Sequence, residues 1–449
     1  MKTIKKIFYL LSSQERKKAF FLLVLTLVMA FLDMLGVASI LPFVTLINNP
    51  NLSETNIFLN YLYQSSRVFG VTNAQEFLIA FGVLVFLFLM ITIFLRAITS
   101  YYHVRFSYLS ECNICKKLIE GYLRQPYSWF IDKHSADLGK KILSDVSTVV
   151  NGCILSLGDI IIQGIVILAL LILLIIMEPL LASYIIFFLF FFYIIIFYFI
   201  KNTLFHIGNE NLDANTNRFM LLNEVFGGLK LVKTSSLELI YINRFAKLSS
   251  IYADNQSKLR FITQFPRIFI EIIAFGGVIL LMLILISSGK DFSSVIATVT
   301  LFAFAGYRLI PALQTVFYSI SQIRFTKSSL NLLYEDLKSL NSSNKSENEG
   351  IVSNDVIIKK FIKLNNINYT YPNTQFKKLI NINLEIPVLK KVGIIGVSGS
   401  GKTTLVDVIL GLLHPNQGTL VIDETIITNS NKRSWQKKNW LCPAKNLFI

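Results

Sequence analysis

Residues 396–403 read Gly396-Val397-Ser398-Gly399-Ser400-Gly401-Lys402-Thr403 and fill the pattern G-x-x-x-x-G-K-[ST] at every fixed position. Glycine in such a loop lets the backbone approach a phosphate group closely, so that N–H groups at a helix N-terminus face its oxygens. The apolar run 391–395 in front predicts a buried strand, and the run 404–410 behind predicts a helix. This order of strand, loop and helix predicts a nucleoside triphosphate site rather than an empty glycine-rich turn.

Each part of this loop has an expected role in binding the nucleotide. Lys402 is expected to reach the β- and γ-phosphates, and the Thr403 hydroxyl is expected to ligate Mg²⁺. The other contacts are expected from the loop backbone and from the first residues of the helix. The predicted nucleotide-binding residues of this stretch are Gly396, Val397, Ser398, Gly399, Ser400, Gly401, Lys402, Thr403 and Thr404.

The composition of the chain places most of it in a membrane. Hydrophobic residues make up 53% and charged residues only 16%, where a soluble chain carries about 25% charged residues. A bilayer is crossed by about 20 apolar residues in a helix. Six apolar stretches meet this length and predict six spans, at residues 19–47, 76–100, 152–177, 180–200, 268–288 and 293–324.

The basic residues predict which side of the membrane each connection occupies. The first 18 residues carry six Lys or Arg, the connection 103–150 carries seven and the connection 201–267 carries nine, whereas the loop 48–75 has one. Because cytoplasmic loops are enriched in Lys and Arg, both termini and both long connections are predicted to be cytoplasmic. The net charge of +16 favours contact with anionic membrane lipids, and no compact basic domain predicts binding of nucleic acid.

The long connections also predict the domain organisation. Each connection has helical periodicity, so we expect two membrane helices to extend into the cytoplasm and to be joined there by a short transverse helix. The expected tips of the two connections are residues 125–130 and 232–238. The polar segment 339–350 is typical of a flexible linker. The predicted domains are a membrane domain at 1–338, this linker at 339–350, and the N-terminal part of a nucleotide-binding domain at 351–449.

Six spans with two long cytoplasmic connections, followed by a P-loop domain, resemble an ATP-binding cassette (ABC) exporter half-transporter. The segment Asn368-Tyr369-Thr370-Tyr371-Pro372 resembles the family's strand that stacks an aromatic ring on adenine, which gives this role to Tyr371. The resemblance implies a fold class: an α-helical transmembrane domain of the type I exporter kind, followed by an incomplete α/β P-loop domain. It also implies ATP and Mg²⁺ as cofactors, a homodimer or a heterodimer with a full-length half-transporter, and multiple passes through a bacterial inner membrane.

Within this family the chain is most similar to bacterial flippases of lipid-linked oligosaccharides. The likeness rests on the acid-bearing first helix, Phe31-Leu32-Asp33-Met34-Leu35-Gly36 to Leu41-Pro42-Phe43, and on three arginine contexts. These contexts are Phe94-Leu95-Arg96-Ala97, Phe265-Pro266-Arg267-Ile268 and Tyr307-Arg308-Leu309-Ile310-Pro311. The resemblance implies a lipid-linked substrate and makes Arg96, Arg267 and Arg308 candidate substrate-binding residues. The alternative is an exporter of a peptide or of a lipid-A-type substrate.

These arginines have two physical interpretations that the sequence leaves open. A cation within an apolar helix costs about 3 kcal/mol, so it faces a polar cavity or a partner. Guanidinium groups that line a cavity would suit a pyrophosphate through bidentate hydrogen bonds. Alternatively they pair with Asp33, Asp159 or Glu271, or extend to lipid phosphates.

The family's hydrolytic motifs are not found in these 449 residues. They are the Ser-Gly-Gly-Gln signature, the Walker B carboxylates and the switch histidine, and Ala444 follows Pro443 where the family has glutamine. We therefore expect a truncated nucleotide-binding domain, no catalytic residue, and binding of ATP without hydrolysis. Two classes of function stay open: an ATP-driven flippase, and a non-catalytic nucleotide-binding membrane protein or decayed gene product.

Overall fold

A computed structural model of the chain describes residues 2–48, 57–66, 73–131, 133–287, 292–347, 358–372, 374 and 376–437. The chain divides into two compact units. Unit 1 comprises residues 1–117 and 139–335, and unit 2 comprises residues 118–138 and 336–449. Each unit is described by itself below.

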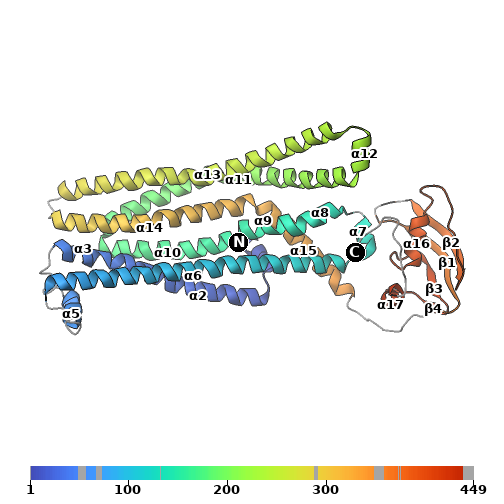
Figure 1. The fold of residues 1–449 in the computed structure, drawn as a ribbon, viewed down its shortest axis with the longest axis horizontal. Helices are drawn as coiled ribbons and strands as arrows, with labels where there is room; N and C mark the ends of the chain where they lie inside the picture. Colours follow the sequence, from blue (N-terminus) through green and yellow to red (C-terminus); the bar gives the residue numbers. More distant parts are fainter. Residues whose placement is uncertain are drawn as a thin grey trace. The chain divides into compact units, whose positions relative to one another are not determined.

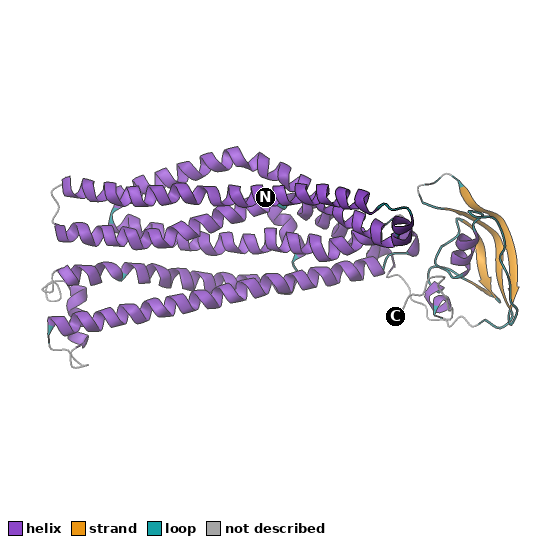
Figure 2. Cartoon of the chain, turned by 45° about the horizontal axis from the view of Figure 1, so that its top comes forward, coloured by secondary structure: helices purple, strands orange, loops and turns teal. Residues whose placement is uncertain are grey.

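Unit 1 is built from long helices that lie side by side (Figures 1 and 2). The long helices are α2 (Ser13–Ala38), α6 (Ala74–Leu123), α10 (Ser156–Met177), α11 (Pro179–Gly227), α13 (Glu238–Ser287), α14 (Phe292–Phe325) and α15 (Lys327–Glu347). The short ones are α1 (Lys2–Leu10), α3 (Ile40–Asn48), α5 (Ile57–Ser66), α8 (Ser135–Lys140), α9 (Val146–Val149) and α12 (Leu229–Thr234), with π-helical turns at Lys141–Asp145 and Val150–Leu155. Helices α6, α8 and α15 each have residues in both units.

Local sequence signals explain where several of these helices begin. Ser12 caps α2, and its hydroxyl accepts a hydrogen bond from the Glu15 N–H while the Glu15 carboxylate accepts one from the Ser12 N–H, which is a complete capping box. Pro179 occupies the first position of α11, where the missing N–H of proline costs nothing. Glu178 alone separates α11 from Met177, the last residue of α10.

Five helices of the described residues are long and apolar enough to cross a membrane: Ser13–Ile47, Gln75–Leu123, Ser135–Met177, Ala182–Gly227 and Thr298–Phe325. They overlap five of the six predicted spans, and contain the whole of three of them, 19–47, 76–100 and 152–177. The other prediction, 268–288, falls on α13, where many side chains and residue 288 itself lie outside the described residues. Short helices lie at both predicted tips, since α7 (Tyr127–Ile131) follows α6, and α12 joins α11 to α13.

The core of unit 1 forms where α2, α10 and α14 meet. Leu170 of α10, and Leu301 and Ala305 of α14, are fully or almost fully buried there. Close packing continues along α14, because a methyl group added at Gly208 of α11 would overlap the carbonyl oxygen of Phe325. These contacts hold together helices that are far apart in the sequence.

Unit 2 contains a four-stranded antiparallel sheet with the order β2-β1-β3-β4. The strands are β1 (Phe361–Thr370), β2 (Lys377–Pro387), β3 (Gln417–Ile422) and β4 (Thr425–Ile426). Helices α16 (Lys402–Ile409) and α17 (Lys432–Gln436) belong to the same unit, and Val408 and Trp435 pack with Leu364 and Ile422 in its core.

Two predictions differ from the structure in unit 2. The buried strand predicted at 391–395 is not formed: no described strand pairs with it, and Ile395 is 98% exposed. Apolar composition alone does not make a strand, because the backbone N–H and C=O groups need a partner. The polar segment predicted as a linker is helical up to Glu347 as part of α15, and the rest of it lies outside the described residues.

Candidate functional site

The predicted phosphate loop has the backbone geometry that its glycines allow. Gly399 and Gly401 have φ angles of 83° and 92°, in the left-handed region that favours glycine. Gly401 directly precedes α16 and caps its N-terminus. The loop N–H groups and the N-terminus of α16 therefore lie together, as an anion site requires.

Two lysines approach this loop. The Lys402 ammonium donates hydrogen bonds to the carbonyl oxygens of Gly396 (2.8 Å) and Val397 (2.9 Å). Lys378 of β2 donates to the carbonyl oxygen of Gly399 at 2.7 Å. Lys378 was not among the predicted residues, because its proximity depends on how β2 lies against the loop. A polyanion bound here would meet two positive charges.

Tyr371 and Thr404, both predicted from the sequence, are in direct contact. The Tyr371 hydroxyl lies 2.8 Å from the Thr404 hydroxyl, and the ring of Tyr369 meets that of Tyr371 edge-on with centroids 5.1 Å apart. Thr404 is buried, whereas Thr403, the predicted Mg²⁺ ligand, is exposed at the start of α16. The aromatic residue therefore lies next to the first turn of the helix that follows the loop.

The first predicted cytoplasmic tip contacts the sheet-containing part of unit 2. Pro126 and Ser128, at α7, line a cavity of about 250 Å³ together with Gly411, His414 and Lys432. Burial raises the pKa of the Tyr127 hydroxyl, and the nearby Asp407 adds to this rise. Residues of the predicted tip at 125–130 therefore line one cavity with residues of the sheet-containing part of this unit.

Two of the three candidate arginines meet on one carboxylate in unit 1. Arg96 of α6 donates two hydrogen bonds to Asp33 of α2, at 2.9 and 2.7 Å. Arg308 of α14 donates one at 2.8 Å. The side chain of Asp33 is 1% exposed, whereas those of Arg96 and Arg308 are 33% and 20% exposed. The ion-pair interpretation with Asp33 is thus confirmed for both arginines.

Arg267 does not join this cluster. Its side chain donates to Glu271, one helical turn further along α13, at 2.7 Å, and both groups are largely exposed. Its role as a substrate-binding residue stays a prediction.

The Asp33 cluster lines a cavity of about 340 Å³ between α2, α6, α10 and α14. His103 and Gln163, which were not predicted as site residues, also line this cavity, as does Asp159, which was expected only as a possible partner for arginine. In the structure Asp159 lies 3.5 Å from the Nδ1 atom of His103 instead. Polar residues inside apolar helices were the signal that could have indicated these positions.

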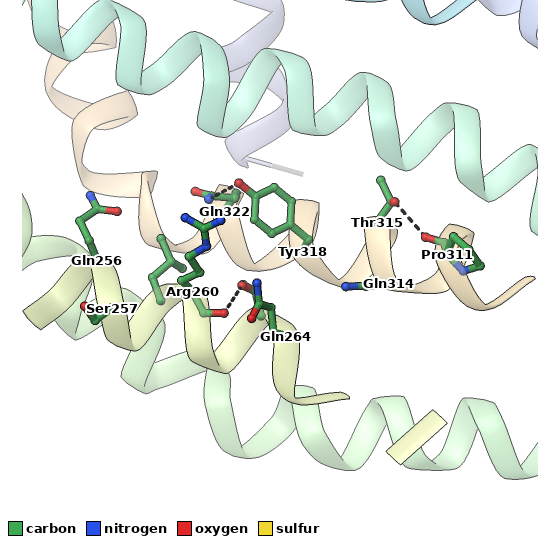
Figure 3. A pocket seen from close by; sticks show the side chains of 11 residues that line it. Gln256, Ser257, Arg260, Gln264, Pro311, Gln314, Thr315, Tyr318 and Gln322 are labelled. Atoms are coloured by element: carbon green, nitrogen blue, oxygen red, sulfur yellow. Dashed lines mark hydrogen bonds between the residues drawn. The ribbon is translucent and has the colours of Figure 1, made fainter. Parts of the chain in front are cut away.

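A second cavity, of about 760 Å³, lies between α13 and α14 and is polar (Figure 3). Its lining includes four glutamines, Arg260 and Tyr318; the glutamines are Gln256, Gln264, Gln314 and Gln322. Pro311 and Thr315 line both this cavity and the Asp33 cavity. One face of α14 therefore connects the charged cavity to the amide-rich one.

Two parts of the chain match known protein families. Residues 18–309 match the family model of the ABC transporter transmembrane region, and residues 379–448 match the family model of the ABC transporter. The chain belongs to the ABC transporter family. Its architecture is that of an ABC exporter half-transporter, with a helical transmembrane region and an ATP-binding region on one chain.

Individual relatives agree with this assignment. The chain is 24% identical over 242 residues to ABC transporter B family member 29, chloroplastic, of Arabidopsis thaliana, covering 53% of this chain and 37% of that protein. It is 53% identical over 62 residues to the methionine import ATP-binding protein MetN of Helicobacter hepaticus, covering 14% of this chain and 17% of that protein. The chain thus spans well under half the length of these curated relatives.

A solved structure shares the fold over almost the whole chain. It is described as a bacterial Atm1-family ABC exporter with ATP bound, and it superimposes with a TM-score of 0.63 at 14% identity. The match covers 94% of this chain and 70% of that chain. At this identity the likeness concerns the fold alone.

Proposed function

We propose that this chain is a subunit of an ATP-driven exporter that moves a lipid-linked oligosaccharide across the membrane. The observation that carries the proposal is the meeting of Arg96 and Arg308 on Asp33 at the wall of a membrane cavity. Two guanidinium groups face one carboxylate, so one positive charge of this cluster is not neutralised by Asp33. A phosphate group can use the remaining donors of both arginines.

The neighbouring amide-rich cavity is an argument that the substrate carries a glycan. Glutamine side chains both donate and accept hydrogen bonds, so they suit the hydroxyl groups of a sugar. Because Pro311 and Thr315 line both cavities, a phosphate beside Arg308 would place an attached sugar next to Gln314. A peptide is the second candidate substrate, since a relative that is 27% identical over 195 residues is named nisin transport ATP-binding protein NisT.

The energy source in this proposal is ATP with Mg²⁺. The P-loop backbone from Gly396 to Gly401 would hold the phosphates, and Lys402 would exchange its two carbonyl partners for phosphate oxygens. Tyr371 would stack on adenine and Thr403 would ligate Mg²⁺. A measurement of ATP hydrolysis by the purified protein separates this proposal from a non-catalytic, nucleotide-binding role.

We further propose a dimer, either of two copies or with another half-transporter, in a bacterial inner membrane with both termini in the cytoplasm. The orientation rests on the distribution of Lys and Arg along the sequence. Reporter fusions after Tyr63 are expected to be external, and fusions after Lys133 and Lys247 internal. A cytoplasmic signal after Tyr63 would overturn this orientation.

The substrate proposal is tested by transport of a polyprenyl-pyrophosphate-linked glycan in proteoliposomes. Arg308→Ala is expected to abolish transport while membrane insertion stays intact, and Arg308→Lys to restore only part of it, because an ammonium group cannot form the planar pair of hydrogen bonds. Arg267→Ala is the matched control, since its arginine pairs with the exposed Glu271 of its own helix. Equal transport by Arg308→Ala and the parent protein would refute the phosphate role.

A further inference from the structure

Unit 1 also carries an apolar groove that the proposed transport does not use. It has a volume of about 600 Å³ and runs between α11 and α14, with α10 along one part. Its walls are aliphatic and aromatic side chains such as Leu171, Phe190, Leu313 and Phe317. Phe190 is largely exposed, so the groove is open on the surface of an apolar helix that a bilayer would surround.

Two contacts define the direction of the groove. The rings of Tyr193 and Phe317 are 5.8 Å apart, and the Arg324 guanidinium lies 5.7 Å from the Phe197 ring. Residue numbers therefore increase in the same direction on both helices. From Ile186 to Lys201 on α11, and from Leu309 to Arg324 on α14, the helical rise is about 22 Å.

Both helices place a cation at the same end of the groove. Lys201 on α11 and Arg324 on α14 line that end, and the Lys201 ammonium lies 4.2 Å from the centre of the Tyr198 ring. No carboxylate lines the groove, and within the described part of the chain neither cation forms an ion pair. An apolar groove that ends at two cations without a carboxylate partner is complementary to an anionic amphiphile.

We propose that this groove binds an anionic phospholipid of the membrane as a resident ligand. Its phosphate lies between Lys201 and Arg324, and one acyl chain lies along the apolar walls. The length fits, because the hydrocarbon part of one leaflet is about 15 Å thick, less than the rise of the groove. The charges fit as well, since anionic lipids attract basic residues near the membrane surface by about 1 kcal/mol each.

The test measures lipid retention by the full-length protein. Protein purified from mixed phosphatidylglycerol and phosphatidylcholine vesicles is analysed by native mass spectrometry. The parent protein is expected to retain phosphatidylglycerol in preference. The double variant Lys201→Gln, Arg324→Gln is expected to bind it about 30-fold more weakly, which corresponds to about 2 kcal/mol.

Two further variants make the result specific to the groove. Ile194→Trp fills a partly exposed position of the groove wall and is expected to lower retention of both lipids while the cations remain. Lys230→Gln combined with Lys247→Gln removes the same charge at exposed positions of α12 and α13 and is expected to change nothing. Unchanged phosphatidylglycerol retention in the Lys201→Gln, Arg324→Gln variant would overturn the proposal. The proposal would also be overturned if Ile194→Trp changed the oligomeric state but left lipid retention unchanged.

Discussion

The guanidinium of Arg308 donates a 2.8 Å hydrogen bond to the carboxylate of Asp33, although 275 residues separate them in the sequence. Arg96 binds the same carboxylate from a third helix. Asp33 thereby connects α2, α6 and α14 through charge-assisted hydrogen bonds, which are stronger than neutral ones. The cluster is thus both a structural connection between helices and the wall of the candidate substrate cavity.

Asp33→Ala is expected to destabilise the protein. The substitution leaves two partly buried guanidinium groups without their carboxylate, and loss of one partner from a buried ion pair costs about 3 kcal/mol. Thermal unfolding in detergent measures the loss. Asp254→Ala is the control, because its pair with Lys258 is exposed and is expected to contribute less than about 0.5 kcal/mol. Equal melting temperatures for the two variants would contradict the structural role of Asp33.

Gly208→Ala is expected to weaken the packing of α11 against the end of α14. The new methyl group would overlap the backbone oxygen of Phe325, and overpacking of this kind costs about 1 to 3 kcal/mol. Gly164→Ala on α10 is the matched control, because nothing lies within 4 Å of its added methyl group. Alanine there is expected to be neutral or slightly stabilising, since it favours a helix by up to about 1 kcal/mol over glycine. A similar loss of thermal stability in both variants would argue against this close contact.

Lys402→Ala is expected to weaken ATP binding by the full chain at least about tenfold, because charged hydrogen bonds contribute about 1.5 to 3 kcal/mol. Lys378→Ala is expected to have a smaller effect in the same direction, since its ammonium group lies at the loop carbonyl of Gly399. Titration with a fluorescent ATP analogue measures both. Lys390→Ala, at an exposed lysine beyond β2, is the control, and an equal loss there would show that general charge rather than the loop controls affinity.

The Asp423 carboxylate is expected to make stability depend on pH at the acid end. Backbone N–H groups of Phe361, Lys359 and Lys360 donate to it at 2.9, 2.6 and 2.8 Å, and these bonds lower its pKa. A lowered folded-state pKa stabilises the fold above the ordinary value of about 3.9, and this contribution is lost as the pH falls through the folded-state value.

The corresponding experiment compares the parent protein with Asp423→Ala from pH 7 to pH 3. The variant is expected to melt at a lower temperature at neutral pH, and the difference is expected to shrink below pH of about 4, where the carboxylate accepts protons. Glu424→Ala, at the neighbouring exposed carboxyl group, should show no such trend. A difference that stays constant over this range would mean that the ionised form of Asp423 contributes no stability.

The long helices and the transverse helix α7 were predictable from local patterns. Helix length follows from the number of consecutive apolar residues, and the end of α6 follows from Pro126, because proline disfavours helix in the residue before it. The phosphate loop was predictable because its sequence motif places glycine where the backbone needs a positive φ angle, as at Gly399 and Gly401. In contrast, the strand predicted at 391–395 was wrong, since a strand depends on a partner that an apolar run does not specify.

The sequence alone determined that most of this chain belongs in a membrane, that a phosphate loop precedes a helix, and that Arg96 and Arg308 need either a cavity or a partner. Only the tertiary structure decided that both arginines share Asp33 at the wall of a cavity, whereas Arg267 pairs with Glu271. The physical reason is distance. Sequence patterns report on structure within a few residues of each other. An ion pair between residues 275 positions apart forms only after helix packing has brought α2 and α14 together.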